Sequence, residues 1–173
     1  DQLSIEVAEV IISVLSETAR GVVPNHILEF AFRAMRPLIY GPGVSGMRPQ
    51  RGQMMGSYLS FPLLCLQNRI AFLWAFRWLP RRQRDSLPCL INGDDILFQS
   101  GPAASRRWMS VVGELGLEVE KTKTSVSSEF GTLNSTLLQW SGLYLRVRQT
   151  LRWGRLKVQE FPHSLATIFR EWL

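Results

Sequence analysis

The sequence predicts an α+β fold built as a single domain. Helical spacing of apolar residues dominates the first part of the chain, a short hairpin pattern lies near its middle, and a further helix and several strand-like runs follow. The 173 residues suit one domain, and a hydrophobic content of 46% is sufficient for a folded core.

Two amphipathic helices are predicted at the start of the chain. Residues 3–19 carry apolar side chains three and four positions apart, which places them on one helix face. Pro24 precedes a second helical pattern at residues 25–35, and Pro37 ends it. Residues 41–57 are rich in Gly and Pro and are predicted to form a loop.

A long helix and a hairpin are predicted next. Residues 60–78 have the spacing and length of a helix, and the basic segment 79–88 connects this helix to the hairpin. Two short β-like runs, 89–91 and 96–98, flank the dipeptide Asn92-Gly93. This dipeptide favours a tight hairpin because both of its residues tolerate a positive φ.

The remainder of the chain is predicted to mix one helix with strands. Residues 103–116 have a helical pattern, and residues 117–128 are predicted to form a strand that runs into a turn. Residues 138–158 are predicted to form two or three strands with a turn at Gly154, and a short helix at 164–173 closes the chain.

The basic residues are distributed unevenly. The net charge is +6, and the segment from Phe30 to Arg84 holds nine arginines and no Asp, Glu or Lys. A second segment, 146–157, holds five basic residues without an acidic one. Such asymmetry indicates a polyanionic partner, and the preference for arginine favours phosphate. Charge alone leaves a merely solvated surface open as the alternative.

The cysteines and the longest apolar stretch exclude two classes of protein. Cys65 and Cys89 give neither a disulfide framework nor a metal-ligand spacing, so free thiols in a reducing compartment are expected. The apolar stretch 59–76 is interrupted by Gln67, Asn68 and Arg69, which argues against a membrane span.

Two adjacent aspartates, Asp94 and Asp95, lie at the predicted hairpin tip between apolar strands. Carboxylates are costly near apolar surroundings unless a cation or hydrogen bonds compensate them. Mg²⁺ is commonly bound by one or two protein carboxylates together with substrate phosphates. The triplet Gly-Asp-Asp alone is a weak signal, because the same residues are common in surface turns.

Three sequence motifs in a fixed order give this triplet its context. "RGQMMGSYLSFPLL" precedes the hairpin, "NGDD" forms its tip, and "KTKTSVSSEFGTLNST" follows it. These motifs resemble motifs B, C and D–E of the palm of viral RNA-dependent RNA polymerases, specifically the ourmia-like (botourmiavirus) group with its narna- and levi-like relatives. The resemblance implies an RNA-directed RNA polymerase that replicates a positive-strand RNA virus genome by nucleotidyl transfer with two Mg²⁺ (or Mn²⁺) ions.

The resemblance also implies an architecture. It places a palm core with the end of motif A and motifs B, C and D at residues 1–140, and the motif E region with the start of a thumb at residues 141–173. The palm is expected to be an antiparallel sheet of three or four strands backed by helices.

Catalytic and metal-binding roles follow from the resemblance position by position. Asp94 matches the metal-binding aspartate of motif C, and Asp95 matches its less directly involved neighbour; both are expected to be catalytic and metal-binding. Lys123 matches the motif D lysine, the general acid for the leaving pyrophosphate, although Lys121 is an alternative two residues away.

The same resemblance assigns residues of the motif B segment. Gly56 and Ser57 belong to the loop beside the template, and Ser60 matches the hydroxyl residue near the ribose of the incoming nucleotide. Many polymerases carry an asparagine where this chain has Leu64. Asn68, one helical turn further on, is a substitute for it or simply a polar helix position.

The remaining assignments concern RNA and the start of the chain. Arg48 and Arg51 are expected to contact the template or the triphosphate. Asn134 and Ser135 match the pair that supports the primer end, with a plain turn as the alternative. Asp1 matches the second, ribose-sensing aspartate of motif A, so the first one is expected upstream and the chain is expected to be a fragment, inactive by itself and without fingers.

Two other functions stay open at this point. The chain is alternatively a non-catalytic RNA-binding fragment, or a reverse transcriptase, although such enzymes usually carry a bulky residue where Gly93 stands. The expected partners are template and product RNA and nucleoside triphosphates. The expected location is the host cytoplasm, with mitochondrial replication as the alternative in related groups.

Overall fold

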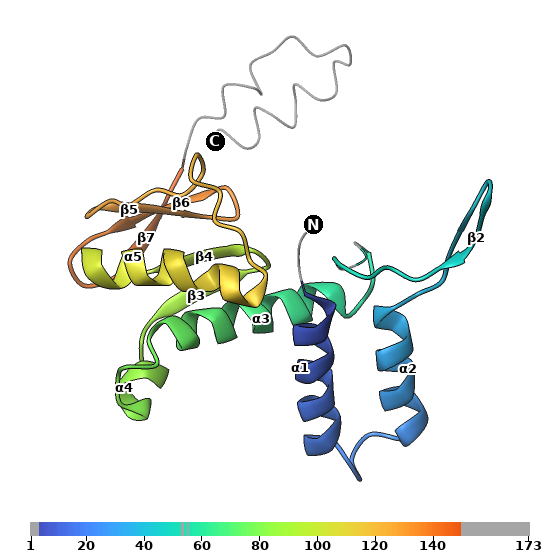
Figure 1. The fold of residues 1–173 in the computed structure, drawn as a ribbon. Coiled ribbons are helices and arrows are strands. Elements are labelled where there is room, and N and C mark those ends of the chain that lie inside the picture. Colours follow the sequence, from blue (N-terminus) through green and yellow to red (C-terminus); the bar gives the residue numbers. More distant parts are fainter. Residues whose placement is uncertain (1–3, 53, 55, 150–173) are drawn as a thin grey trace, which may run out of the picture.

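The computed structural model describes residues 4–52, 54 and 56–149. Helices and small antiparallel sheets alternate along the chain, so the fold is mixed α+β, as predicted (Figure 1). The elements are, in chain order, α1 (Ile5–Thr18), α2 (Asn25–Met35), β1 (Ile39–Gly41), β2 (Val44–Met47), α3 (Ser60–Ala75), α4 (Arg81–Asp85), β3 (Cys89–Asn92), β4 (Asp95–Phe98), α5 (Pro102–Val111), the 3₁₀ helix η1 (Val112–Leu115), β5 (Phe130–Leu133), β6 (Thr136–Trp140) and β7 (Leu145–Arg148).

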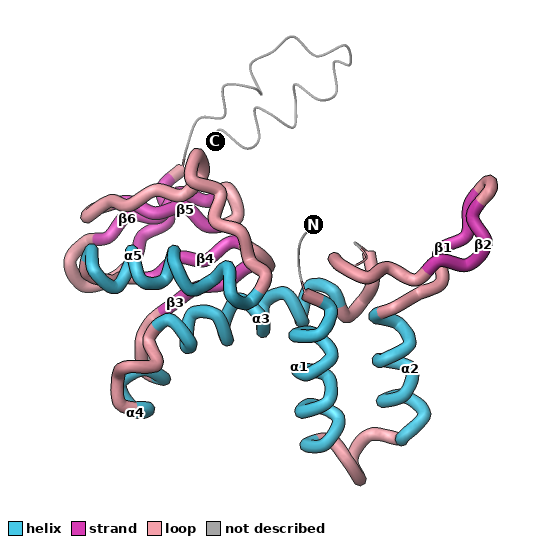
Figure 2. Tube along the Cα trace, viewed as in Figure 1, coloured by secondary structure: helices cyan, strands magenta, loops and turns pink. Residues whose placement is uncertain are grey.

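The two predicted N-terminal helices are confirmed. Ser4 caps α1, because its Oγ accepts a hydrogen bond of 3.4 Å from the backbone N–H of Val7. The helices α1 and α2 lie side by side, and an ion pair of 2.6 Å between Arg36 Nε and Glu9 Oε1 joins them at the end of α2 (Figure 2).

The segment predicted as one long loop, 41–57, contains a strand. β2 pairs with β1 in an antiparallel hairpin, with Gly41 opposite Val44. The two residues between them are Pro42 and Gly43, and Gly43 has a φ of +76°. Proline at the first and glycine at the second central position favour a type II turn, so the residues that predicted a loop instead close a hairpin.

Helix α3 is the element on which both hydrophobic cores of the described chain are built. Near its start, Leu63 packs with Ala8, Ile11 and Ile12 of α1. In its second half, a larger cluster joins α3 to α5 and η1 and packs against the β3–β4 hairpin; its buried members are Ala71, Phe72, Ala75, Phe76, Trp108, Val111 and Val112. One helix therefore holds the α1–α2 pair at one end and the hairpin and α5 at the other.

The ends of two predicted helices differ from the structure. α3 stops at Ala75 instead of residue 78, and the predicted connector 79–88 contains the short helix α4 after Pro80. The helix predicted at 103–116 begins at Pro102 and changes to a 3₁₀ turn at Val112.

The strand predicted at 117–128 is wrong, because these residues form turns and irregular chain. The carbonyl oxygen of Glu120 accepts hydrogen bonds from the N–H groups of Lys123 and Thr124, at 3.1 and 2.9 Å. The Glu120 carboxylate accepts two more, from the backbone N–H and the hydroxyl of Thr122. Local hydrogen bonds of this kind compete with a strand ladder for the same backbone groups.

The expected palm-type sheet of three or four strands stays a prediction, because the largest sheet in the described chain, β5–β6–β7, has three strands but does not include the β3–β4 hairpin. The strands make three separate antiparallel sheets, β1–β2, β3–β4 and β5–β6–β7. β4 and β5 are instead in contact through the Leu97 side chain, which packs so closely on Gly131 that a Cβ at residue 131 would clash with Leu97 Cδ1. Leu97 thus occupies the space that a side chain at residue 131 would need. The predicted turn at Gly154 and the closing helix lie outside the described residues.

The contact between Leu97 and Gly131 yields a prediction. Gly131→Ala forces Leu97 to move, so we expect a loss of about 1–3 kcal/mol in the free energy of unfolding, measured by chemical denaturation. The loss should shrink in a Leu97→Ala background, where the space is free. Gly113→Ala is the matched control, because a Cβ there meets nothing within 4 Å. If Gly131→Ala and Gly113→Ala lower the free energy of unfolding equally, Leu97 does not pack closely on residue 131.

The turn at Glu120 yields a pH prediction. The hydrogen bonds from the Thr122 side chain and backbone, together with Lys123 nearby, lower the pKa of Glu120 below 4.5. The carboxylate therefore stabilises the turn above the ordinary pKa, and this stabilisation is lost as the pH falls through the lowered pKa. Thr122→Val should raise the pKa of Glu120 in an NMR titration. The Thr124 hydroxyl donates to the backbone carbonyl of Glu120 and not to its carboxylate. Thr124→Val should therefore leave the pKa of Glu120 unchanged.

Candidate functional site

The tip of the β3–β4 hairpin carries the paired aspartates. Asn92 pairs with Asp95, so Gly93 and Asp94 form a two-residue loop. Gly93 has a φ of +65°, whereas Asp94 is not in the positive-φ region. Glycine at the first loop position is typical of a type II′ turn. The predicted hairpin is confirmed, but its loop is Gly93-Asp94 and not Asn92-Gly93, because Asn92 is the last residue of β3.

One face of α3 forms a seat for this tip. The Asn68 side chain is 1% exposed, and its amide nitrogen donates to the carbonyl oxygens of Gly93 at 3.1 Å and Asp94 at 3.0 Å. The backbone N–H of Gly93 donates to Cys65 Sγ at 3.2 Å. An ideal Cβ on Gly93 would lie 3.5 Å from Phe61 and 3.6 Å from Leu64. Residues 61, 64, 65 and 68 share one helix face, so α3 fixes the position of Asp94.

This seat bears on two of the sequence predictions. The amide of Asn68 is engaged by the hairpin, and its expected contact with a ribose stays a prediction. Leu64, which replaces the usual asparagine, lies against Gly93. Cys65 and Leu64 were missed as supports of the site, although their spacing of three and four residues from Asn68 and Phe61 indicates a shared face.

The second aspartate points to another turn. Asp95 Oδ2 accepts a hydrogen bond of 3.1 Å from the backbone N–H of Asn134, although 39 positions separate the two residues. Asn134 and Ser135 are the two-residue loop of the β5–β6 hairpin, with φ values of 47° and 59°. Two positive φ values are typical of a type I′ turn. The fold thus brings the predicted primer-end pair to the predicted metal site.

Asp94 and Asp95 are both exposed, but the Asp94 carboxylate, unlike that of Asp95, makes no hydrogen bond or ion pair within the described part of the chain. No group of three or more His, Cys, Asp or Glu side chains suited to a metal occurs among residues 4–52, 54 and 56–149. Oxygen ligands from one or two carboxylates still fit Mg²⁺ that also binds substrate phosphates. Asp1, the other expected acidic residue, lies outside the described residues.

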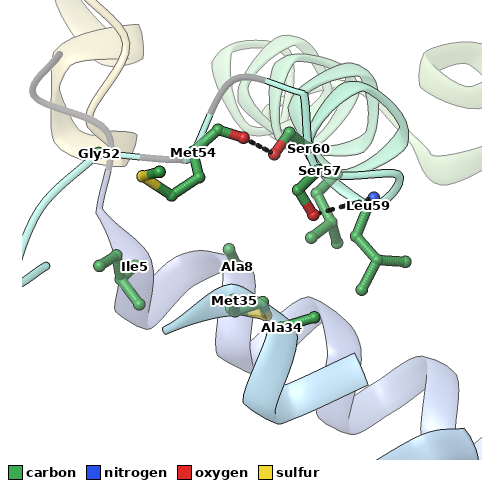
Figure 3. A pocket seen from close by; sticks show the side chains of 10 residues that line it. Ile5, Ala8, Ala34, Met35, Gly52, Met54, Ser57, Leu59 and Ser60 are labelled. Carbon is green, nitrogen blue, oxygen red and sulfur yellow. Dashed lines mark hydrogen bonds between the residues drawn. The ribbon is translucent and has the colours of Figure 1, made fainter. Parts of the chain in front are cut away.

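The loop before α3 folds back on the start of that helix. The Ser60 hydroxyl donates to the carbonyl oxygen of Met54 at 2.6 Å, and the backbone N–H of Leu59 donates to Ser57 Oγ at 3.4 Å. Figure 3 shows these serines above a small cavity that α1 and α2 also line. Gly56 is exposed and has a φ of +88°, a backbone conformation that few other residues adopt.

The predicted cationic residues lie on the surface. Lys121 and Lys123 are exposed in the turn after η1, and within the described chain neither forms an ion pair with Asp94 or Asp95. Arg48 and Arg51 are exposed in the segment between β2 and α3. None of the helices in the described ranges is long and apolar enough to cross a membrane.

A comparison with known proteins bears on this site. Over 93 residues, 53% of its length, the chain is 37% identical to the RNA-dependent RNA polymerase of Ourmia melon virus (isolate Melon/Iran/VE9). The chain is related to a viral RNA-dependent RNA polymerase. The matched region spans 11% of that polymerase. No protein-family model matches the chain, and no solved structure matches it. The predicted relation to viral polymerases is confirmed, whereas the subgroup and the motif roles stay predictions.

The seat under the hairpin yields a prediction about Asn68. Asn68→Asp keeps the shape of the side chain but removes both donors and places a carboxylate against two carbonyl oxygens. We expect the free energy of unfolding to fall by at least about 2 kcal/mol in chemical denaturation. Asn25→Asp is the control, because Asn25 is exposed at the start of α2 and an acid is favourable there. If Asn68→Asp lowers the free energy of unfolding no more than Asn25→Asp does, the hydrogen bonds from Asn68 do not stabilise the hairpin tip.

Proposed function

We propose that this chain forms part of the palm of an ourmia-like RNA-directed RNA polymerase, with Asp94 as a metal-binding catalytic residue. The observation that carries the proposal is the hairpin tip, where a buried asparagine of α3 binds the backbone carbonyls of Gly93 and Asp94 and so fixes the backbone that bears the exposed Asp94 carboxylate. A rigid support is what a catalytic ligand requires. The relation to the Ourmia melon virus polymerase supports the same conclusion.

The reaction would be attack of a primer 3′-OH on the α-phosphate of a nucleoside triphosphate, with pyrophosphate as the leaving group. Two Mg²⁺ (or Mn²⁺) ions, when bound, neutralise and orient the reacting oxygens. Within this chain, Asp94 supplies a carboxylate ligand and Asp95 lies beside it. Lys123 is proposed to protonate the leaving pyrophosphate.

RNA and nucleotide contacts are proposed for the surrounding residues. Gly56 and Ser57 are assigned to the template, and Arg48 and Arg51 to template or triphosphate. The other assignments are contacts with the ribose for Ser60, Asn68 and Asp1, and support of the primer end for Asn134 and Ser135. The partners would be template and product RNA and nucleoside triphosphates, and the location would be the host cytoplasm.

The proposed boundaries remain those of the resemblance, with the palm core at residues 1–140 and the motif E region and start of the thumb at residues 141–173. Gly93 favours an RNA-directed RNA polymerase over a reverse transcriptase. Its φ of +65° strains any residue with a side chain, and Phe61 and Leu64 already occupy the adjacent space.

RNA binding without catalysis is the second candidate function, and the charge distribution favours it. The net charge is +6, and the segments 30–84 and 146–157 hold no acidic residue. Binding through phosphates would weaken as the salt concentration rises, with a slope set by the number of phosphates contacted. The experiment on Asp94 separates the two functions.

We predict that Asp94→Asn lowers templated, Mg²⁺-dependent nucleotide incorporation by at least about 100-fold in the complete protein that carries this chain, because one ligand is lost. RNA affinity and its salt dependence should stay within about twofold. Asp85→Asn is the control, since Asp85 pairs with Arg81 and Arg84 away from the tip.

Incorporation unchanged by Asp94→Asn would exclude the catalytic proposal. RNA binding without incorporation by the unsubstituted protein would favour the binding function. A preference for deoxynucleotides would instead indicate a reverse transcriptase.

A further inference from the structure

Asp95 differs from Asp94 in what its carboxylate contacts. Asp95 is the first residue of β4, and its Oδ2 accepts the hydrogen bond from the backbone N–H of Asn134. A charged acceptor makes such a bond stronger than a neutral one. The N–H of the first loop residue in a two-residue hairpin does not take part in the ladder, so it is free to donate to water or, as here, to a side chain from another element.

A second contact acts on the same face of β4. Residues two positions apart in a strand point to the same side, which places Asp95 and Leu97 together. Leu97 packs over Gly131 of β5, and Asp95 bonds Asn134 just beyond the end of β5. These contacts link two hairpins that share no backbone ladder in the described chain. Asp94, in the loop, has no contact of this kind.

We propose that Asp95 is a positioning residue that holds the β5–β6 turn, with Asn134 and Ser135, in a fixed place beside Asp94. The inference rests on the proposed polymerase function, because the turn is the segment assigned to the primer end. It separates the two aspartates: Asp94 serves the metal ions, and Asp95 serves the placement of the primer end through its Oδ2.

The first test measures the contact itself. Hydrogen exchange at the Asn134 amide is followed in the complete protein. Asp95→Ala removes the acceptor and should speed exchange about three- to tenfold. Asp95→Asn keeps an acceptor oxygen and should restore much of the protection. Asp94→Asn is the control, because Asp94 does not accept this hydrogen bond, and it should leave exchange at the Asn134 amide unchanged. Unaltered exchange in Asp95→Ala would overturn the proposal.

The second test measures the role in the reaction. Asp95→Ala should raise the KM for primer–template about tenfold or more at an unchanged Mg²⁺ dependence, and Asp95→Asn should recover most of that loss. If Asp95→Asn shifts the Mg²⁺ dependence as strongly as Asp95→Ala does, Asp95 acts as a metal ligand and the proposal is wrong. An unsubstituted protein without incorporation would refute the polymerase function, while the exchange experiment would still decide whether the contact exists.

Discussion

The two hydrogen bonds from the Asn68 amide to the carbonyl oxygens of Gly93 and Asp94 are the interaction on which the site depends. A buried side-chain amide is costly unless it is paired, and unpaired carbonyls at a tight turn carry the same cost. Each group therefore needs the other. Their pairing ties the middle of α3 to the tip of the hairpin, whose strands already pack on the larger hydrophobic cluster.

The neighbouring Gln67 is a second buried amide of α3 that is paired with a backbone carbonyl, on an adjacent face of the helix. It is 0% exposed, and its Nε2 donates to the carbonyl oxygen of Leu115 at 2.7 Å. The polar residues that interrupt the apolar stretch 59–76 thus have structural roles: Gln67 links α3 to η1, and Asn68 links α3 to the hairpin. Arg69, the third residue of the interruption, donates to Cys89 Sγ at the start of β3.

Sequence patterns predicted local structure best where one physical signal dominated. Proline boundaries and helical spacing predicted residues 25–35 as α2, and the Gly-Asp-Asp hairpin was placed to within one residue. The strand expected after residue 117 failed because Thr122 and Thr124 bond Glu120 locally. The contact of Asp95 with Asn134 was not predicted, because no local pattern reports a hydrogen bond across 39 positions. The packing of Leu97 on Gly131 was not predicted for a similar reason, since it depends on tertiary structure.

The two tight turns that meet at Asp95 and Asn134 also restrict how the chain can change in length. Each is a two-residue loop, and adding or removing one residue would turn every following strand side chain to the opposite face. Such a change would carry Asp95 or Asn134 out of reach of the other. The irregular segment between η1 and β5 has no strand partner that fixes its register. Insertions and deletions among related chains are therefore expected to accumulate between residues 117 and 129 and to be absent from both turns.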